Sequence, residues 1–451
     1  MQDLTRGPIP RHLASMAAPI AIGMLFQTLY VLVDLFFVSR LGDAAIAGVG
    51  AAANVSFLVM ALTQVLGIGT TTLIAQAAGR KDQADAQLVF NQSLLLAALC
   101  AAFTLLAGYG LSGLFTRALG ADAASAQAGD QYLMWFLPGL ALQFAIVAMG
   151  SALRGSGLAM PGMVVQVVTV IINAILAPVL IAGWGTGHPL GVAGAGLATT
   201  LAMVAGVAML YAYFVKLETW VGFDAHAMRA RPQVWKRILA IGLPAGGEFA
   251  LMFVLIAAVY FIIRPLGAYA QAGYGIGSRV MQAVFLPAMA IAFAVSPIAG
   301  QNMGAKLHDR VRQTFVHAAL ASSGVMLVLT LLCQWMPEAL VRPFGHGHDA
   351  QALAVAAEFL RILSWNFLAQ GLIFTCSGMF QALGNTLPSL LSSASRLFTF
   401  VLPGLWLGSR HGFHLEQLWH LSVATVALQA ATSLWLLRGQ FQRRLVAVPA
   451  V

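Results

Sequence analysis

Charged side chains are scarce in this sequence. Only 9% of its 451 residues are Asp, Glu, Lys or Arg, whereas an ordinary soluble domain carries about 25%. Hydrophobic residues make up 60% of the chain. This number of charged residues is too small to cover the surface of a soluble protein of this length. The composition therefore excludes a soluble enzyme and predicts an integral membrane protein that crosses the bilayer many times.

Cysteine and acidic residues are also rare. The three cysteines, Cys100, Cys333 and Cys376, fall within or beside apolar runs and lack metal-ligand spacing, so we interpret them as small apolar side chains. No two carboxylates stand close together within an apolar run, which argues against a membrane enzyme with an acidic metal cluster, such as a prenyl transferase. We therefore predict no catalytic residue, no cofactor and no metal site. A metal site between "HGHD" (346–349) and "RHGFH" (410–414) is an alternative to ordinary polar loops.

Long apolar runs dominate what is present. A helix needs about 20 apolar residues to cross the bilayer core, and lipid leaves no water to satisfy stray backbone groups, so these runs must be helices. The first run is too long for the core of a signal peptide and further runs follow it, so we expect it to stay as the first span. We predict an all-α integral membrane fold with twelve transmembrane helices near 16–38, 51–74, 91–113, 131–153, 162–183, 191–214, 238–263, 273–299, 315–335, 353–377, 388–408 and 417–437, of which the fifth, tenth and eleventh are the least regular.

The distribution of Lys and Arg predicts the orientation. With the N-terminus in the cytoplasm, sixteen basic residues fall on the cytoplasmic side and five, namely Arg40, Arg117, Arg264, Arg342 and Arg410, on the other. This excess places both termini inside. The net charge of +9 is accordingly a topology signal, and no soluble face exists that could bind nucleic acid.

The sequence contains an internal repeat. At an offset of 225 residues Pro19 matches Pro244, "LG" at 41–42 matches 266–267, and Gln76, Gly79 and Lys81 match their counterparts. A repeat of six helices enters the membrane in the same direction each time, so the two copies are parallel repeats around a central cavity, where transporters of this kind bind substrate. We predict an N-lobe (1–214), a cytoplasmic linker (215–237) and a C-lobe (238–451).

Two carboxylates lie inside the spans, Asp34 in the first and Glu248 in the seventh, and each is costly in lipid. They are not repeat equivalents, since Asp34 matches Val259 and Glu248 matches Gly23. Burial favours the protonated form of a carboxylate, so such a group can exchange a proton for a cation. We predict that both are coupling residues; the alternative is that Asp34 reaches the surface or pairs with Arg40.

Other polar side chains within the spans are candidates for binding the substrate or a cation, although each on its own is more often a helix-to-helix contact. Gln27 and Tyr30 share the face of Asp34 by their spacing. The full set of candidates is Gln27, Tyr30, Asn54, Asn173, Thr199, Arg279, Gln282, Trp365, Asn366 and Arg396.

Several stretches resemble the multidrug and toxic compound extrusion (MATE) family. They include "FQTLYVLVDLFFVSRLGDAAIAGVG" (26–50), "RGSGLAMP" (154–161), "INAILAPVLI" (172–181), "GVAGAGLATT" (191–200) and "FQALGNTLP" (380–388) with "ASRLFTFVLP" (394–403), in the family's order over nearly the whole chain. The resemblance implies a twelve-helix, two-lobed antiporter of the bacterial inner membrane that expels organic cations and drugs in exchange for protons or sodium.

Carried over residue by residue, Asp34 matches the family's first-helix aspartate, and Asn173 and Thr199 match two neighbours that surround a cation in the DinF-like branch. Ala177 stands where that branch has a second aspartate, and Glu248 resembles an acidic position of the NorM-like branch. Losing one carboxylate weakens a sodium site, so we predict proton coupling, with sodium coupling as the alternative.

We therefore expect a monomeric multidrug antiporter, not an enzyme, whose partners are small cationic or amphipathic molecules and membrane lipids. The rival from the same group of folds is a lipid-linked oligosaccharide flippase, which would need a cationic cavity for phosphates.

Overall fold

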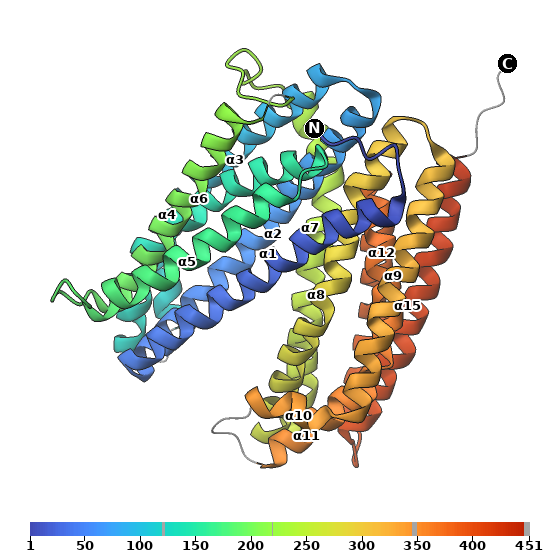
Figure 1. The fold of residues 1–451 in the computed structure, drawn as a ribbon. Helices are drawn as coiled ribbons and strands as arrows, with labels where there is room; N and C mark the ends of the chain where they lie inside the picture. The colour runs from blue at the N-terminus through green and yellow to red at the C-terminus, as the bar shows by residue number, and fades with distance from the viewer. Residues whose placement is uncertain (120–121, 219, 345–349, 446–451) are drawn as a thin grey trace. The chain divides into compact units, whose positions relative to one another are not determined.

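The computed structural model describes residues 1–119, 122–218, 220–344 and 350–445, and within these ranges it holds helices and no strand (Figure 1). The first repeat contains α1 (Ile9–Val38), η1 (Ser39–Leu41), α2 (Asp43–Arg80), α3 (Gln83–Leu119), α4 (Ala123–Gly155), α5 (Met160–Ala182) and α6 (Gly191–Lys216). The second contains α7 (Pro232–Ile263), η2 (Arg264–Leu266), α8 (Ala268–Gly304), α9 (His308–Trp335), α10 (Pro337–Val341), η3 (Arg342–Phe344), α11 (Ala350–Leu363), α12 (Asn366–Ala382), α13 (Leu387–Arg396), η4 (Leu397–Val401), α14 (Leu402–Gly408) and α15 (Leu415–Arg444). The all-α prediction is confirmed.

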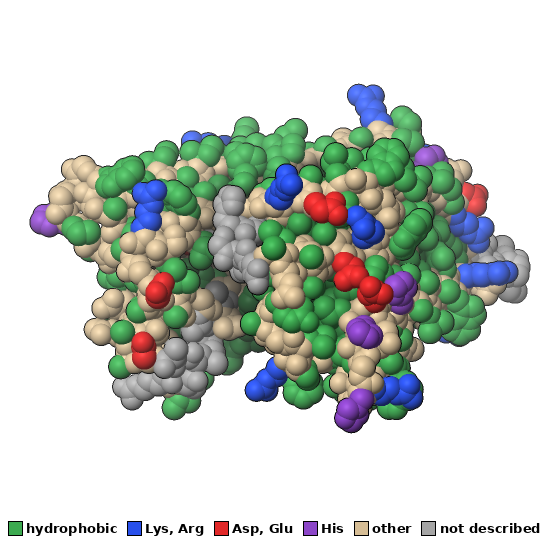
Figure 2. Space-filling model, turned by 90° about the horizontal axis from the view of Figure 1, so that it is seen from below, with side chains coloured by type: hydrophobic (Ala, Val, Ile, Leu, Met, Phe, Trp, Pro, Cys, Tyr) green, Lys and Arg blue, Asp and Glu red, His purple; other side chains and the backbone are tan. Residues whose placement is uncertain are grey.

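The helices are built for a lipid environment. Eleven helices of the described chain are long and apolar enough to cross a membrane, or twelve when the bent pair α11 and α12 is one span. Large apolar side chains face outward on them, such as Leu106 (78% exposed) and Leu320 (68%), where a soluble protein would place charge. In the end view of Figure 2 the charged side chains lie scattered among hydrophobic ones. The chain is a multi-pass membrane protein.

The duplication is visible in the backbone. The two short 3₁₀ turns η1 and η2 lie 225 residues apart, and each is followed by a glycine with positive φ, 103° at Gly42 and 102° at Gly267. Among the described residues, the non-glycine residues with positive φ are Lys81 (59°) and Lys306 (60°), which are also repeat equivalents. Left-handed backbone is costly for a lysine, so its recurrence at both helix ends indicates one inherited turn.

The chain forms two compact units. Unit 1 comprises Met1–Leu4 and Ala18–Gly246, and unit 2 comprises Thr5–Ala17 and Gly247–Val451. The chain changes unit next to Pro19 within α1 and close to Pro244 within α7, the repeat-equivalent prolines. A proline inside a helix removes one backbone hydrogen bond and permits a bend. The lobes predicted from the sequence, 1–214 and 238–451, do not divide α1 or α7 between them. The boundaries of the lobes stay a prediction.

Two of the three least regular spans are interrupted. The tenth is a bent pair, in which α11 and α12 meet at 62°. The eleventh contains a π-helical turn, η4, between α13 and α14. Pro403 explains this turn, because it has no N–H to donate to the carbonyl four residues earlier. The fifth span, α5, is a regular helix that contains Pro178.

The segment between the repeats is held against unit 1. Helices α6 and α7 extend into the predicted linker, so the described linker residues outside these helices are 217, 218 and 220–231. Gln92 of α3 is fully buried; its amide donates to Ala227 O (2.6 Å) and Arg229 O (2.7 Å), and its oxygen accepts from Arg231 N (2.9 Å). The segment is therefore a fixed part of unit 1.

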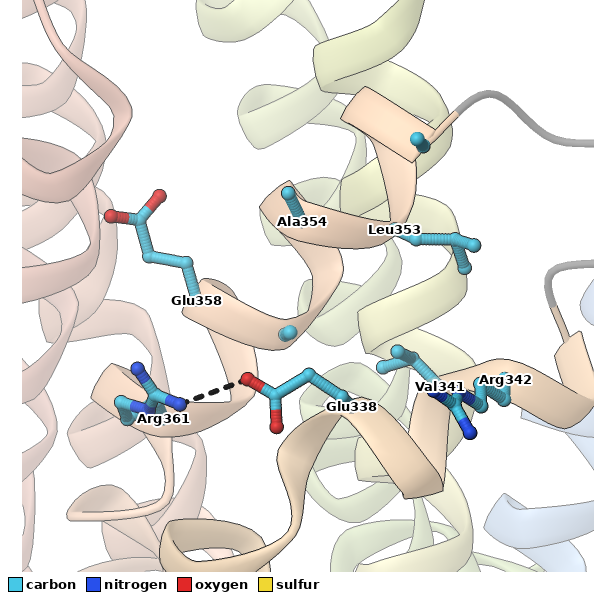
Figure 3. Close-up of a pocket in the computed structure, with 9 residues that line it drawn as sticks. Glu338, Val341, Arg342, Leu353, Ala354, Glu358 and Arg361 are labelled. Carbon is cyan, nitrogen blue, oxygen red and sulfur yellow. Dashed lines mark hydrogen bonds and ion pairs between the residues drawn. The ribbon is translucent and has the colours of Figure 1, made fainter.

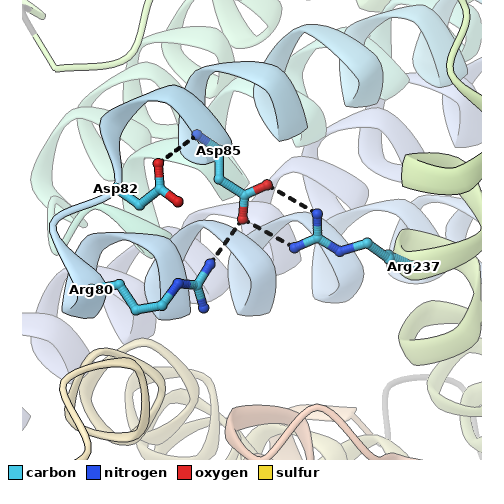
Figure 4. Close-up of polar contacts among 4 residues, drawn as sticks. All are labelled: Arg80, Asp82, Asp85 and Arg237. Carbon is cyan, nitrogen blue, oxygen red and sulfur yellow. Dashed lines mark hydrogen bonds and ion pairs between the residues drawn. The ribbon is translucent and has the colours of Figure 1, made fainter.

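The beginning of α7 is held to α3 by charge (Figure 4). Arg237 donates two hydrogen bonds to the carboxylate of Asp85, at 2.9 and 3.0 Å, and Arg80 donates a third at 2.8 Å. Asp82 caps α3 by accepting a hydrogen bond from the backbone N–H of Asp85 at 3.0 Å. A bidentate Arg-carboxylate contact is directional as well as attractive, so this cluster fixes where the seventh helix starts.

Candidate functional site

A polar cluster surrounds Asp34 in unit 1. The Thr199 hydroxyl of α6 donates to Asp34 Oδ2 at 3.5 Å, and the Asn173 amide of α5 donates to the Tyr30 hydroxyl at 3.3 Å and to Thr199 Oγ1 at 3.5 Å. Three helices thus bring together four of the predicted residues. These distances lie at or near the outer limit of a hydrogen bond, so the polar groups hold one another loosely.

Two oxygen atoms in this cluster have no donor. Asp34 Oδ1 and Asn173 Oδ1 are buried, and neither has a hydrogen-bond partner within the described chain. Unsatisfied buried acceptors are costly. Because two of them lie in one cluster, binding of a proton or a cation there would stabilise it. The cluster can therefore take up positive charge.

Close helix packing positions this cluster. A Cβ on Gly194 would lie 2.5 Å from Leu180 O of α5, and one on Gly196 would lie 2.6 Å from Tyr132 O of α4. Helix α6 can approach both neighbours only because these residues lack side chains, as is common in membrane helices. The "GVAGAGLATT" stretch thus sets Thr199 beside Asn173.

The structure does not support the alternative that Asp34 pairs with Arg40. The Arg40 guanidinium lies over the Phe36 ring, 4.4 Å from its centroid, and among the described residues the ion pairs do not include Asp34. Gln27, predicted on the same face, is exposed on α1. Of the three residues predicted to share one face of the first helix, the structure therefore places Tyr30 and Asp34 in the polar cluster, and Gln27 outside it.

The other candidates are spread over two units. Asn54 lies on α2 of unit 1, exposed, and donates to Gly50 O of its own helix at 3.4 Å. In unit 2, Arg279 and Gln282 are exposed on α8, Trp365 is 65% exposed at the break before α12, and Asn366 is buried with its Oδ1 unpaired within the described chain.

Glu248 lies in a ring of hydroxyl groups in unit 2. Ser389 and Ser377 donate to its Oε2 at 2.7 and 3.0 Å, and Ser393 donates to its Oε1 at 3.3 Å. The ring ties α7 to α12 and α13. Glu248 therefore has more hydrogen-bond donors than Asp34, and its role in coupling stays a prediction.

The structure also shows an open pocket at one end of unit 2 (Figure 3). Helices α10 and α11 line it, and Arg361 donates to Glu338 across it at 3.0 Å. Both side chains are more than half exposed, and an exposed ion pair of this kind contributes little. We assign no function to this pocket.

Metal ligands do not gather in the described residues. No group of three or more His, Cys, Asp or Glu side chains there has the geometry to hold a metal ion. The "HGHD" loop (346–349) lies outside the described residues, so the alternative of a metal site between the two loops stays open.

Sequence reasoning missed the serine ring and the residues that hold the linker. Serine is frequent in membrane helices, so three serines on two helices carry little signal, although Ser389 and Ser393 share a face by their spacing of four. Gln92 and Asn91 form an unusual buried polar pair at the start of α3. Two adjacent amides at the end of an apolar span are a usable signal for such an anchor.

Two repeats of membrane-spanning helices, with a polar cluster around a buried carboxylate, are typical of a membrane transporter. The MatE family model matches residues 19–179 and 244–407, one match in each repeat, and their starts are 225 residues apart. The matches cover more than half of the chain. This chain belongs to the MatE family.

Similar proteins extend over the same length. The FAD transporter of Shewanella oneidensis is 26% identical over 414 residues, covering 90% of this chain and 89% of the relative. The multidrug export protein MepA of Staphylococcus aureus is 24% identical over 448 residues, covering 96% and 95%. These alignments support the MATE assignment; they leave the DinF-like branch as a prediction.

Solved structures share the fold. A MOP superfamily transporter from Pyrococcus furiosus, described as having a binding pocket of reversed polarity, has a TM-score of 0.90 and 25% identity, covering 98% of this chain and 97% of the other. An outward-facing multidrug resistance MATE transporter has a TM-score of 0.91 at 24% identity, covering 99% and 98%. The two-lobed fold is thereby confirmed.

Proposed function

We propose that this protein is a secondary active multidrug efflux transporter that exchanges organic cations and drugs for protons by alternating access. Its family and the name of its relative MepA, a multidrug export protein, support multidrug transport. The Lys and Arg distribution supports an inner-membrane location with both termini in the cytoplasm. We propose that it acts as a monomer.

The pair of unpaired oxygens at Asp34 and Asn173 carries the proton assignment. An ionised Asp34 leaves two buried acceptors without a donor. Protonation of Asp34 Oδ1 turns one of them into a donor and removes the uncompensated charge from a dry environment. Loading a proton thus stabilises the cluster, while deprotonation creates the negative charge that attracts a cationic substrate.

Sodium is the alternative coupling ion. Oxygens of Asp34, Asn173 and Thr199 are the type of ligand that a hard cation prefers, but Ala177, one turn after Asn173, is fully buried and offers no ligand. A site with one carboxylate and weak neutral oxygens is better suited to a proton, which needs a single lone pair.

The relative named for FAD and the oligosaccharide flippase are the other substrate alternatives. Both imply cargo that carries phosphate, and a cavity lined by positive charge. In unit 1 the buried cluster is acidic, which favours a cationic cargo at this place.

The test is dye transport by the full-length protein in inside-out membrane vesicles, with pH and sodium gradients imposed separately. A proton-coupled transporter moves an ethidium-like cation in response to the pH gradient at constant sodium. Asp34→Asn keeps the shape of the side chain and removes its titration, so we expect the proton-driven rate to fall by about tenfold or more, as for a lost charge in a dry site.

The matched control is Asp43→Asn. Asp43 is exposed in the first turn of α2, so the same substitution there leaves proton-driven transport unchanged. Undiminished transport in the Asp34 variant refutes the coupling role of Asp34. Transport that follows the sodium gradient at constant pH refutes proton coupling and leaves the efflux function intact.

A further inference from the structure

Arg396 places a guanidinium inside a membrane span of unit 2. Arg396 is the tenth residue of the 22-residue span 387–408 and is only partly exposed. Its Nη2 donates to the Ser422 hydroxyl at 3.3 Å and its guanidinium lies over the Phe400 ring at 5.1 Å. Its Nε is buried and has no acceptor, and no carboxylate pairs with it within the described ranges.

A second donor nearby is also unpaired. Trp419 is 1% exposed, and its indole Nε1 has no acceptor in the described chain. Trp419 lies three residues before Ser422 on α15, so both face the same side of that helix. Trp419 and Phe400 belong to one packed cluster, which places the two unpaired donors in the same part of unit 2.

Glu248 does not neutralise Arg396. Ser393 lies between them, three residues before Arg396 on α13, and donates to Glu248. The carboxylate is already satisfied by three hydroxyl groups, while the guanidinium contacts the Ser422 hydroxyl and the Phe400 ring and lies near Tyr274. An arginine in the middle of a membrane span is costly and usually marks a ligand or an ion path.

The helix is irregular at this point. The π-helical turn Leu397–Val401 begins directly after Arg396, and such turns often occur at functional sites. Pro403 accounts for the turn. An acceptor with negative charge would satisfy both donors and neutralise the guanidinium.

We propose that Arg396 and the indole N–H of Trp419 form an anion-binding subsite, so that the substrates of this transporter include molecules with a carboxylate or phosphate group. This inference rests on the proposed transport function and narrows its substrates: besides cations, the protein takes zwitterionic and anionic amphipathic compounds. Guanidinium groups recognise both anions through paired N–H donors.

Binding of two dyes to the purified full-length protein in neutral detergent tests the subsite. Rhodamine 6G is a cationic ester, and rhodamine 19 is the corresponding free acid, which carries a carboxylate at neutral pH. Fluorescence anisotropy gives a Kd for each. We expect Arg396→Gln to weaken binding of the acid, relative to the ester, by about tenfold or more, the value of one charge-assisted hydrogen bond.

Three further variants define the role. Trp419→Phe keeps the ring and removes the N–H, and we expect it to shift the acid-to-ester ratio in the same direction by a smaller factor. Arg396→Lys keeps the charge but not the planar group and gives an intermediate ratio. Arg410→Gln is the control, because Arg410 also lies over an aromatic ring, that of Trp406, at 3.5 Å but is exposed. Its ratio matches that of the unmodified protein.

The outcomes separate this inference from the proposed function. An acid-to-ester ratio that stays within about twofold in Arg396→Gln, well below the effect of one such hydrogen bond, overturns the subsite, even where vesicles still transport the ester. Vesicles that transport neither dye refute the proposed function, and the binding ratio still decides the subsite. Nanodiscs containing anionic lipid that abolish selective binding of the acid assign the site to a lipid headgroup and overturn the substrate assignment.

Discussion

Gln92 is the point where the segment between the repeats is most firmly held. Its side chain, fully buried nine residues after the first residue of α3, makes three hydrogen bonds to the backbone of residues 227, 229 and 231. Gln92→Ala removes all three at once. The substitution changes no charge and keeps a good helix former, so its effect measures the anchor itself.

The expected cost follows from what is left behind. A buried backbone group without its partner costs about 1–3 kcal/mol. Ala227 is buried, so its carbonyl would lose its partner without a replacement. Arg229 and Arg231 are exposed, so water can replace part of the hydrogen bonding that their backbone groups lose. We therefore expect Gln92→Ala to lower the free energy of unfolding by about 2–4 kcal/mol.

Thermal unfolding of the purified protein in detergent measures this cost. Gln83→Ala is the control on the same helix, because Gln83 is exposed and makes one hydrogen bond to the linker, to Trp220 O at 2.9 Å. Its loss costs about 0–1 kcal/mol. Equal midpoints for the two variants would refute the reasoning, since they would mean that the linker is not anchored through Gln92.

Two smaller sets of variants test the coupling site and the repeat. Ala177→Asp adds a carboxylate one turn after Asn173, and we expect dye transport to become dependent on the sodium gradient; unaltered dependence on pH alone contradicts the role given to this position. Lys81→Gly and Lys306→Gly each relieve a left-handed residue and should raise the free energy of unfolding by up to about 1 kcal/mol. Opposite signs for the two would contradict an equivalent turn, and the measurement is the unfolding midpoint of each.

The membrane spans could be predicted because lipid imposes one rule on every one of them. A run of apolar residues must be a helix, so the type and order of the spans followed from composition. The ends of the helices did not follow from composition. Helix α2 continues beyond its apolar run as far as Arg80, and α3 begins at Gln83, before its apolar run. Polar residues at these ends still gain backbone hydrogen bonds, and hydropathy does not register that gain.

The repeat could be predicted from identities at loops, and the backbone confirmed it there. Lys81 and Lys306 match at the 225-residue offset, and both have positive φ. Interruptions within spans were harder to place. Irregular composition indicated the tenth and eleventh spans, but the 62° bend and the π-helical turn depend on tertiary packing as well as on Pro403.

The candidate site was predictable to different depths. Helical spacing alone placed Tyr30 beside Asp34, whereas Asn173 and Thr199 followed from the family resemblance, because no local pattern links residues on three different helices. The serine partners of Glu248 were not foreseen. A hydroxyl in a membrane helix usually bonds to its own backbone, so its sequence gives no sign of a distant carboxylate.

The two buried carboxylates show how a duplicated scaffold acquires different chemistry in its halves. Asp34 receives one weak hydrogen bond and keeps an oxygen unpaired, so a proton changes its environment greatly. Glu248 receives three hydroxyl hydrogen bonds, which engage both of its oxygens. A group that works by titration must be poorly satisfied in one of its charge states, and one that holds helices together must be satisfied in the state it keeps. By this criterion Asp34 is the stronger of the two candidates for carrying the transported proton, and the coupling role of both carboxylates stays a prediction.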